Sequence, residues 1–479
     1  MGGWRTRAEA GGRRRLAIPI QRIEYNDGPA GEGDPLRKSI VDHPARIVPL
    51  AFLATVLIGT VLLSLPWATT SGSAAPLLTA LFTATSAACV TGLITVDTAT
   101  YWSPFGQVVI LGLFQVGGFG IMAGATLLGL LISRRMRLGQ RLVAQAETRS
   151  LQLADVKGVL LTILGVTLIC EAVVAAVLTM RLHFGYGEPW GSAAWTGIFH
   201  SVSAFNNAGF STYSDNLMGF ALDPLILLPL CAAIIVSGLG FPVINEVLKE
   251  WRTPRRWSIH AKLTLLGTLG LLFLGFAGVA VAEWNNIGTM GDMSASGKAL
   301  NAFAHSVMSR TAGFNAVDVG QMRPETLFLT NGLMLIGGGS AGTAGGIKVT
   351  TFLLLGFVVW AEIRGRSDVT AFRRRICPDA QRQALAVVLL AVGLVGVSTL
   401  AILSLTTQPL DKVLFEVISA FATVGMSTGI TAALPPSAQM ILIGLMFVGR
   451  VGTITVAAAL ALRARHVPYR YPQERPLVG

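Results

Sequence analysis

Long apolar blocks separated by short basic segments run through this sequence and constrain its fold more than any other feature. The blocks contain segments of about 20 apolar residues, the length that a helix needs to cross a bilayer. Only 13% of the 479 residues are charged, against about 25% in soluble proteins. The main solvent for this chain is therefore lipid, and we expect an all-α, multi-pass integral membrane protein.

Most of the 37 lysine and arginine residues lie in five polar segments. These are the residues before 47, residues 134–157, 249–262 and 364–382, and the residues from 463 onward. The positive-inside rule places all five in the cytoplasm, so that each apolar block crosses the membrane an even number of times and both termini are cytoplasmic. The net charge of +12 then reflects topology and contact with membrane lipid, and we expect no nucleic-acid partner.

Each apolar block has the same three-part pattern, in which a short segment lies between two spanning segments. The predicted spanning pairs are 47–65 with 105–132, 158–180 with 224–247, 261–282 with 327–363, and 384–405 with 440–462. The short segments are 76–89, 190–206, 298–309 and 410–422. They are too short to cross, so they are either re-entrant helices or amphipathic helices on the outer surface.

This pattern predicts eight transmembrane helices arranged as four repeats of spanning helix, pore helix and spanning helix around a central pore. The expected organisation is a basic cytoplasmic tail at 1–43, repeats at 44–135, 156–250, 258–363 and 380–463, and a cytoplasmic tail at 464–479. Internal repetition of this kind is a strong architectural signal.

Each short segment ends in a loop with a glycine at a fixed register, and this favours the re-entrant reading. A phenylalanine stands ten residues before the glycine in all four repeats, at Phe82, Phe199, Phe303 and Phe415. A Ser-Ala pair begins six residues before the glycine in three of them, at Ser86, Ser203 and Ser419.

Such loops have the chemistry of a cation filter. Rings of backbone carbonyls can replace the hydration shell of an ion, glycine permits the backbone angles and close approach that this needs, and a pore helix turns its negative end toward the ion. One such tripeptide could be an ordinary turn, but four copies between spanning segments predict a pore with K⁺ at the carbonyls. The predicted filter residues are Val90, Thr91 and Gly92; Asn207, Ala208 and Gly209; Thr311, Ala312 and Gly313; and Thr423, Val424 and Gly425.

Three acidic residues, Asp97, Asp215 and Asp318, follow the filter glycines by five or six positions. Carboxylates in an outer vestibule would concentrate cations there. Aspartates at such positions are also typical of turns and helix caps, and both readings stay open.

The second spanning segment of the third repeat is interrupted by a glycine-rich stretch that cannot hold a stable helix, since each glycine costs about 1 kcal/mol relative to alanine. We interpret it as a gate made of Gly337, Gly338, Gly339, Ser340, Gly342, Thr343, Gly345 and Gly346. Arg450 stands in the middle of the last spanning segment, where an arginine is expensive and functional by default. It could donate hydrogen bonds to this stretch, or be a structural arginine at a helix end. The smaller glycine groups of the other second helices predict close helix packing.

The four repeats, the loops 206–210 and 310–314, the interrupted helix and Arg450 resemble the Trk/Ktr/HKT superfamily of bacterial K⁺ transporters. A polar tail in place of an extra pair of helices before residue 47 makes the chain look like the KtrB-type, ion-translocating subunits. The resemblance implies K⁺ uptake at the bacterial plasma membrane by a homodimer that sits on a cytosolic, KtrA-type nucleotide-binding ring. It also implies Na⁺ as an activator and regulation by ATP or ADP only through that partner. Glycine at Gly92, where related Na⁺ carriers tend to have serine, favours K⁺.

The sequence offers two alternatives to K⁺ uptake, a carrier with another selectivity and a membrane enzyme or receptor. The residue two positions before the glycine differs between the repeats, which leaves a Na⁺-preferring or poorly selective carrier of the same fold as an alternative. A membrane enzyme or receptor would need converging reactive side chains, but the 6 histidines are dispersed, and we expect no enzymatic activity.

Overall fold

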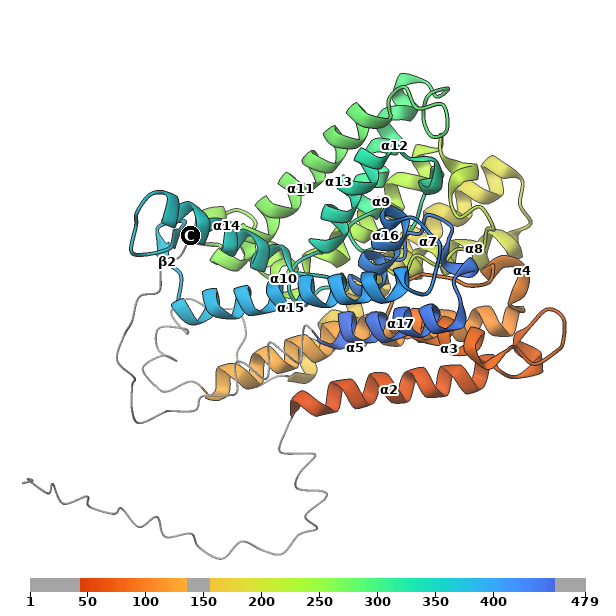
Figure 1. Cartoon of the computed structure of the whole chain (residues 1–479), viewed down its shortest axis with the longest axis horizontal. Coiled ribbons are helices and arrows are strands. Elements are labelled where there is room, and N and C mark those ends of the chain that lie inside the picture. Colours follow the sequence, from red (N-terminus) through yellow and green to blue (C-terminus); the bar gives the residue numbers. More distant parts are fainter. Residues whose placement is uncertain (1–43, 136–155, 453–479) are drawn as a thin grey trace, which may run out of the picture. The chain divides into compact units, whose positions relative to one another are not determined.

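The computed structural model describes residues 44–135 and 156–452 (Figure 1). The predicted tails at 1–43 and 464–479 lie outside the described residues, as does the last part of the final spanning segment. The first repeat contains α2 (Pro44–Leu63), α3 (Leu77–Ala88), the short α4 (Thr98–Tyr101) and α5 (Pro104–Arg135). The second contains α7 (Val156–Tyr186), α8 (Trp190–Asn206), α9 (Pro224–Leu239) and α10 (Phe241–Glu250).

The third repeat contains α11 (Ile259–Glu283), α12 (Ala295–Met308), α13 (Pro324–Leu335) and α14 (Val349–Ile363). A two-residue hairpin, β1 (Thr370–Ala371) with β2 (Arg374–Arg375), connects it to the fourth repeat. That repeat contains α15 (Pro378–Leu403), α16 (Leu410–Phe421) and α17 (Pro436–Phe447), which passes into a π-helical turn at Val448–Gly452.

Four of the described helices are long and apolar enough to cross a membrane unaided, and α9 with α10 forms a fifth, bent candidate. The four are Pro104–Thr126, Gly158–Tyr186, Ile259–Glu283 and Pro378–Leu403. Four shorter apolar helices accompany them, at Val48–Leu63, Leu77–Ala88, Val349–Ile363 and Pro436–Gly452. The prediction of an all-α membrane protein is confirmed.

The second spanning helix of the second repeat differs from its prediction as one helix over 224–247. It breaks at Gly240, where the chain bends by 97°. Gly240 has a φ of 89°, and a Cβ there would collide with the carbonyl oxygen of Ser340. Gly240 is therefore a helix break rather than a packing glycine, because the glycine-rich stretch of the third repeat packs against it.

The repeats close into a ring through their pore helices α3, α8, α12 and α16. Each pore helix packs against the first helix of its own repeat and also against the second helix of the preceding repeat. Thus α5 contacts α8, α9 contacts α12, α13 contacts α16, and α17 returns to contact α3. The end of each pore helix is thereby directed toward a common centre.

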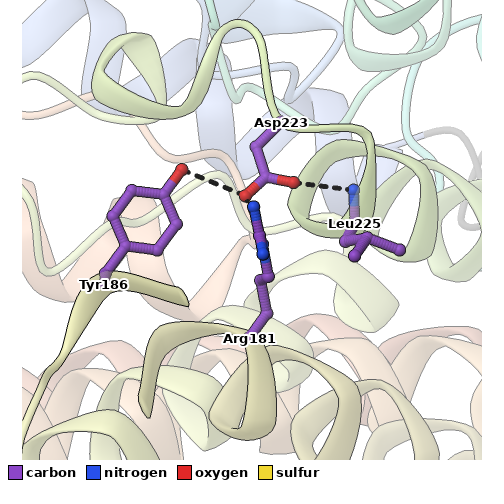
Figure 2. A network of polar contacts seen from close by, with 4 residues as sticks. All are labelled: Arg181, Tyr186, Asp223 and Leu225. Carbon is purple, nitrogen blue, oxygen red and sulfur yellow. Dashed lines mark hydrogen bonds and ion pairs between the residues drawn. The ribbon is translucent and has the colours of Figure 1, made fainter. Parts of the chain in front are cut away.

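Within the second repeat, a polar network joins the end of α7 to the start of α9 (Figure 2). Asp223 accepts hydrogen bonds from Arg181 Nε at 2.7 Å and Tyr186 Oη at 3.0 Å, and it caps α9 by accepting from the backbone N–H of Leu225 at 2.9 Å. The carboxylate is buried, whereas the Arg181 side chain is 37% exposed. Because solvent screens such an ion pair, the helix cap contributes more to the free energy of unfolding than the ion pair does.

We expect Asp223→Ala to lower the thermal denaturation midpoint of the detergent-solubilised protein, because loss of a helix cap costs about 1 kcal/mol. The matched control is Asp379→Ala, which removes an ion pair to Arg382 whose partners are 78% and 72% exposed. This control should leave the midpoint unchanged. Equal midpoints for both variants would contradict a stabilising role for the network.

Candidate functional site

The four predicted filter loops meet at one place, and their glycines are too close together to admit a side chain. A Cβ on Gly92 would collide with the carbonyl oxygen of Ala208, and a Cβ on Gly209 would lie 2.7 Å from that of Ala312. In the same way, a Cβ on Gly313 would collide with the carbonyl oxygen of Val424, and a Cβ on Gly425 would collide with that of Thr91. The contacts run once around the four repeats and close, in the order given by the helix packing.

The backbone of each loop has a positive φ at two positions, with one residue between them whose φ is not positive. The residue two positions before the glycine has a positive φ in every repeat, at Val90, Asn207, Thr311 and Thr423, and so does the glycine itself. In the first loop, the N–H groups of Val90 and Thr91 donate back to the carbonyls of Ala87 and Ser86 at the end of α3. The same return bonds form in the second and fourth repeats, whereas in the third the N–H groups of Ala312 and Gly313 both donate to the carbonyl of Met308. With the N–H groups occupied on the pore-helix side, the carbonyls preceding the glycines lie at the junction of the four loops.

The Ser-Ala pairs found in three repeats have a structural role at this junction. Ser86 Oγ accepts the N–H of Gly92 at 3.0 Å, and Ser419 Oγ accepts that of Gly425 at 3.1 Å. Ser203 Oγ instead donates to the carbonyl of Phe210 at 2.9 Å. The third repeat has Val307 at this register, and there the N–H of Gly313 donates to the carbonyl of Met308 at 3.2 Å.

Several polar side chains of the filter loops are buried without a hydrogen-bond partner among the described residues. They are the hydroxyls of Thr91, Thr311 and Thr423 and the amide nitrogen of Asn207. Buried polar groups are rarely unsatisfied unless water or an ion serves them. A site that handles a hydrated or partly dehydrated cation fits such groups.

The glycine-rich stretch 337–346, called the gate segment below, passes the junction on the side where the pore helices end. A Cβ on Gly345 would collide with the carbonyl of Ala422 and the hydroxyl of Thr423, and one on Gly337 would lie 3.4 Å from Thr311 Cγ2. The segment also packs on the end of α9, where the N–H of Gly339 donates to Gly238 O at 2.8 Å. It thus lies between the filter loops and the broken helix α9–α10.

Three cationic side chains hold the gate segment by its carbonyl oxygens. Arg450 Nη1 donates to Thr343 O at 2.5 Å, Lys348 Nζ donates to Ala344 O at 2.6 Å, and Arg310 Nη2 donates to Gly337 O at 3.1 Å. Arg450 is only 2% exposed. Among the described residues, none of the three forms an ion pair with an acid, so positive charge concentrates beside the junction.

The predicted vestibule aspartates use their carboxylates locally. Asp97 caps α4 by accepting from Ala99 N at 3.0 Å and also accepts from Ser214 Oγ at 2.5 Å, which links the first two repeats. Asp215 accepts from Gly219 N, and Asp318 accepts from Gly320 N. Turn and cap chemistry is therefore present at all three, and their role as a cation-concentrating vestibule stays a prediction.

Two buried acids also lie near the filter loops. Glu171 on α7 accepts from Gln115 Nε2 at 3.2 Å and Asn206 Nδ2 at 3.1 Å, which joins α7 to α5 and to the end of α8. Glu416 on α16 is 1% exposed and hydrogen-bonds the loop that follows Gly425. Sequence reasoning did not single out Glu416 or assign a role to Arg310. The available signal was a charged residue among apolar ones, at Glu416 within its short segment and at Arg310 directly after the short segment of the third repeat.

A family model described as a cation transport protein, TrkH, matches residues 41–466. The chain is 38% identical to the Ktr system potassium uptake protein B of Bacillus subtilis over 91% of its own length and 97% of that protein. It is 37% identical to the protein of the same name from Vibrio alginolyticus, over 91% of this chain and 94% of that protein. It is 34% identical to the potassium/sodium uptake protein NtpJ of Enterococcus hirae, over 91% of this chain and 97% of that protein.

A similar fold occurs in the crystal structure of the potassium transporter TrkH from Vibrio parahaemolyticus. The two superpose with a TM-score of 0.65 over 87% of this chain and 85% of that one, at 18% sequence identity. At this identity the likeness shows a shared fold and no more.

Proposed function

The chain belongs to the TrkH family of cation transport proteins, as a KtrB-type member, and from this premise we propose that it takes up K⁺ through the junction of its four glycine loops. The family consists of transporters rather than enzymes. Three uptake proteins to which this chain is similar are named for potassium, or for potassium and sodium.

The observation that carries the proposal is the closed series of contacts between the four glycines and the carbonyls that precede them. Rings of carbonyl oxygens are the ligands that replace water around a K⁺ ion in a narrow pore. Here one carbonyl from each repeat, at Thr91, Ala208, Ala312 and Val424, lies against the glycine of a neighbouring repeat. The buried, unpartnered threonine hydroxyls at Thr91, Thr311 and Thr423 add polar oxygen to the same place.

We also propose that the gate segment closes this path. Its main chain lies against Thr311 and Thr423 at the ends of two pore helices, and Arg450 anchors it through Thr343. The cationic side chains of Arg450, Lys348 and Arg310 repel K⁺ while the segment is in place. Withdrawal of the segment would remove the obstruction and break its hydrogen bonds to these three side chains.

The wider assembly is proposed from the family. The protein acts in the bacterial plasma membrane with both termini in the cytoplasm, as a homodimer on a KtrA-type ring. ATP or ADP acts through that partner, and Na⁺ serves as an activator. The name "Ktr system" of the relatives supports a system of more than one component.

A Na⁺-preferring or poorly selective carrier is the second candidate function, and it rests on a specific observation. The four loops differ at the position two before the glycine, where valine, asparagine and two threonines stand at Val90, Asn207, Thr311 and Thr423. An unequal ring can fit K⁺ less closely. The relative from Enterococcus hirae is named for both ions.

The test is ion uptake in a bacterial strain that lacks its own K⁺ uptake systems, with and without Gly313→Ser. We expect the wild-type chain, expressed with a KtrA-type partner, to restore growth at low K⁺. Gly313→Ser should weaken growth, because a side chain there would collide with Val424 O.

Na⁺ uptake without K⁺ rescue would support the second candidate instead. If neither ion enters although the protein is present in the membrane with its partner, the transport function itself is contradicted.

A further inference from the structure

Two of the four filter loops are tied to their own pore helices by side chains at the same register. The tie joins the residue nine positions before the glycine to the residue two positions after it. In the second repeat these residues are His200 and Ser211, and in the fourth they are Glu416 and Ser427. Each tie joins the middle of the pore helix to the segment that follows the filter glycine.

Glu416 makes the more extensive tie. Its Oε1 accepts from Ser427 Oγ at 2.5 Å and from Thr428 N at 3.0 Å, and its Oε2 accepts from Thr431 Oγ1 at 2.8 Å. All of these partners can donate, which suits an ionised carboxylate, since that group only accepts. Hydrogen bonds to a charged group are stronger than neutral ones, so the carboxylate fixes the loop 427–431 against α16.

His200 makes the corresponding tie on the other side of the junction. Its Nδ1 lies 2.9 Å from the carbonyl oxygen of Thr196, which can only accept, so Nδ1 carries a proton. Its Nε2 lies 2.9 Å from Ser211 Oγ. Ser211 Oγ also accepts from the N–H of Tyr213 at 3.0 Å, which extends the tie along the segment that follows Gly209.

The first and third repeats cannot form this tie because their side chains lack the necessary groups. The first has Thr83 paired in register with Ile94, whose side chain has no polar atom. The third has Ala304 in register with Asn315, and the alanine has no polar atom. Because the repeats follow one another around the ring, the two tied loops are opposite each other.

We propose that the side-chain ties at Glu416–Ser427 and His200–Ser211 set the ion selectivity of the pore by fixing two opposite filter loops in position. Glu416 and His200 are positioning residues that act on the filter through the segments that follow Gly425 and Gly209. This inference rests on the proposed function, because it assumes that the junction is the ion path. The physical basis is that discrimination between K⁺ and Na⁺ depends on the position and number of the coordinating carbonyls.

A tie that acts by geometry makes a different prediction from a carboxylate that acts by charge. Ser427→Ala removes the hydrogen bond between Glu416 and Ser427 and keeps the charge of Glu416, which still accepts from Thr428 N and Thr431 Oγ1. Glu416→Gln removes the charge, and with it the strength of hydrogen bonds to a charged group, although the amide oxygen can still accept and the amide NH₂ can donate to the Thr431 hydroxyl. If geometry matters, both variants lose selectivity, and if charge alone matters, only the second does.

The matched control is Asn315→Ala in the third repeat. It truncates the residue two positions after the glycine, as Ser427→Ala does. In this repeat the residue nine positions before the glycine is Ala304, so there is no tie to remove. Within the part of the chain that the structure describes, the Asn315 side chain forms one hydrogen bond, a local one from Nδ2 to Val317 O at 3.1 Å.

The experiment measures competitive uptake of Rb⁺, as a tracer for K⁺, and of Na⁺ in the same membrane vesicles that contain the full chain and its partner. The ratio of the two does not depend on how much protein each variant yields. We expect Ser427→Ala and Glu416→Gln to lower the Rb⁺/Na⁺ ratio roughly threefold or more, since each breaks a hydrogen bond to a charged group. Asn315→Ala should keep the wild-type ratio.

A wild-type ratio in Ser427→Ala would overturn the proposal, whatever Glu416→Gln does. An equal fall in Asn315→Ala would also overturn it, because any disturbance of a filter exit would then suffice. If the wild-type chain itself carries neither ion, the proposed function fails first, and the two failures are thus distinguishable.

Discussion

Replacing Gly425 with alanine is expected to reduce K⁺ uptake at least about tenfold, because the ring of carbonyls cannot keep its geometry around a side chain. Gly425 has a φ of +96°, and a Cβ there would collide with Thr91 O and lie 3.0 Å from Gly92 Cα. Both neighbours are backbone atoms and cannot rotate away. The measurement is the initial rate of K⁺ uptake in cells without other K⁺ systems.

The control for this prediction is Gly429→Ala, four residues further along the same repeat. Gly429 also has a left-handed φ, of +91°, but nothing lies within 4 Å of a Cβ built there. Both variants carry the same backbone penalty, about 1–2 kcal/mol, and only Gly425→Ala adds the collision. Equal uptake by the two variants would mean that the close approach of the glycines does not matter for transport.

The second large effect is expected for Arg450→Ala, which should raise the ion flux several-fold. The guanidinium holds the gate segment through Thr343 O and places a positive charge beside the junction. Its removal releases the anchor and the repulsion together, so the segment leaves the path more often. The flux is measured in vesicles, with and without the regulatory partner, and is normalised to the amount of inserted protein.

Arg450→Lys separates the two contributions. Lysine keeps the charge but has a shorter reach and no planar fork of donors. A raised flux in both variants would assign the effect to the anchor, and a raised flux only in Arg450→Ala would assign it to the charge. If Arg450→Ala and a deletion of residues 338–345 both leave the flux unchanged, the gate segment does not control the path.

Much of the fold could be predicted from the sequence because membrane helices are marked by length and apolar composition. The fourfold register of the glycines located the pore segments within a few residues, as with α8 at Trp190–Asn206. The break at Gly240 could not be predicted. Its cause is a tertiary contact with Ser340, a hundred residues away, and nothing in the local sequence separates it from the packing glycines of other second helices.

The site was predictable where backbone conformation depends on residue type and unpredictable where it depends on partners. Glycines repeated at one register indicated the filter loops, and a lone arginine in an apolar segment pointed to Arg450. The bonds of Arg310 and Lys348 to the gate segment required knowledge of how the segment folds back. The tie of Glu416 to Ser427 spans only 11 residues, but its meaning appears only when the four repeats are compared in space.

Ion flux through the purified protein in sealed liposomes tests most directly whether the four glycine loops form one K⁺ path. K⁺ and Na⁺ fluxes are measured with the partner present, for the wild-type chain, Gly425→Ala and Gly429→Ala. We predict K⁺ flux in preference to Na⁺ in the wild type and in Gly429→Ala, and its loss in Gly425→Ala. Flux that persists in Gly425→Ala with wild-type selectivity would contradict the claim, because the ion would then cross elsewhere.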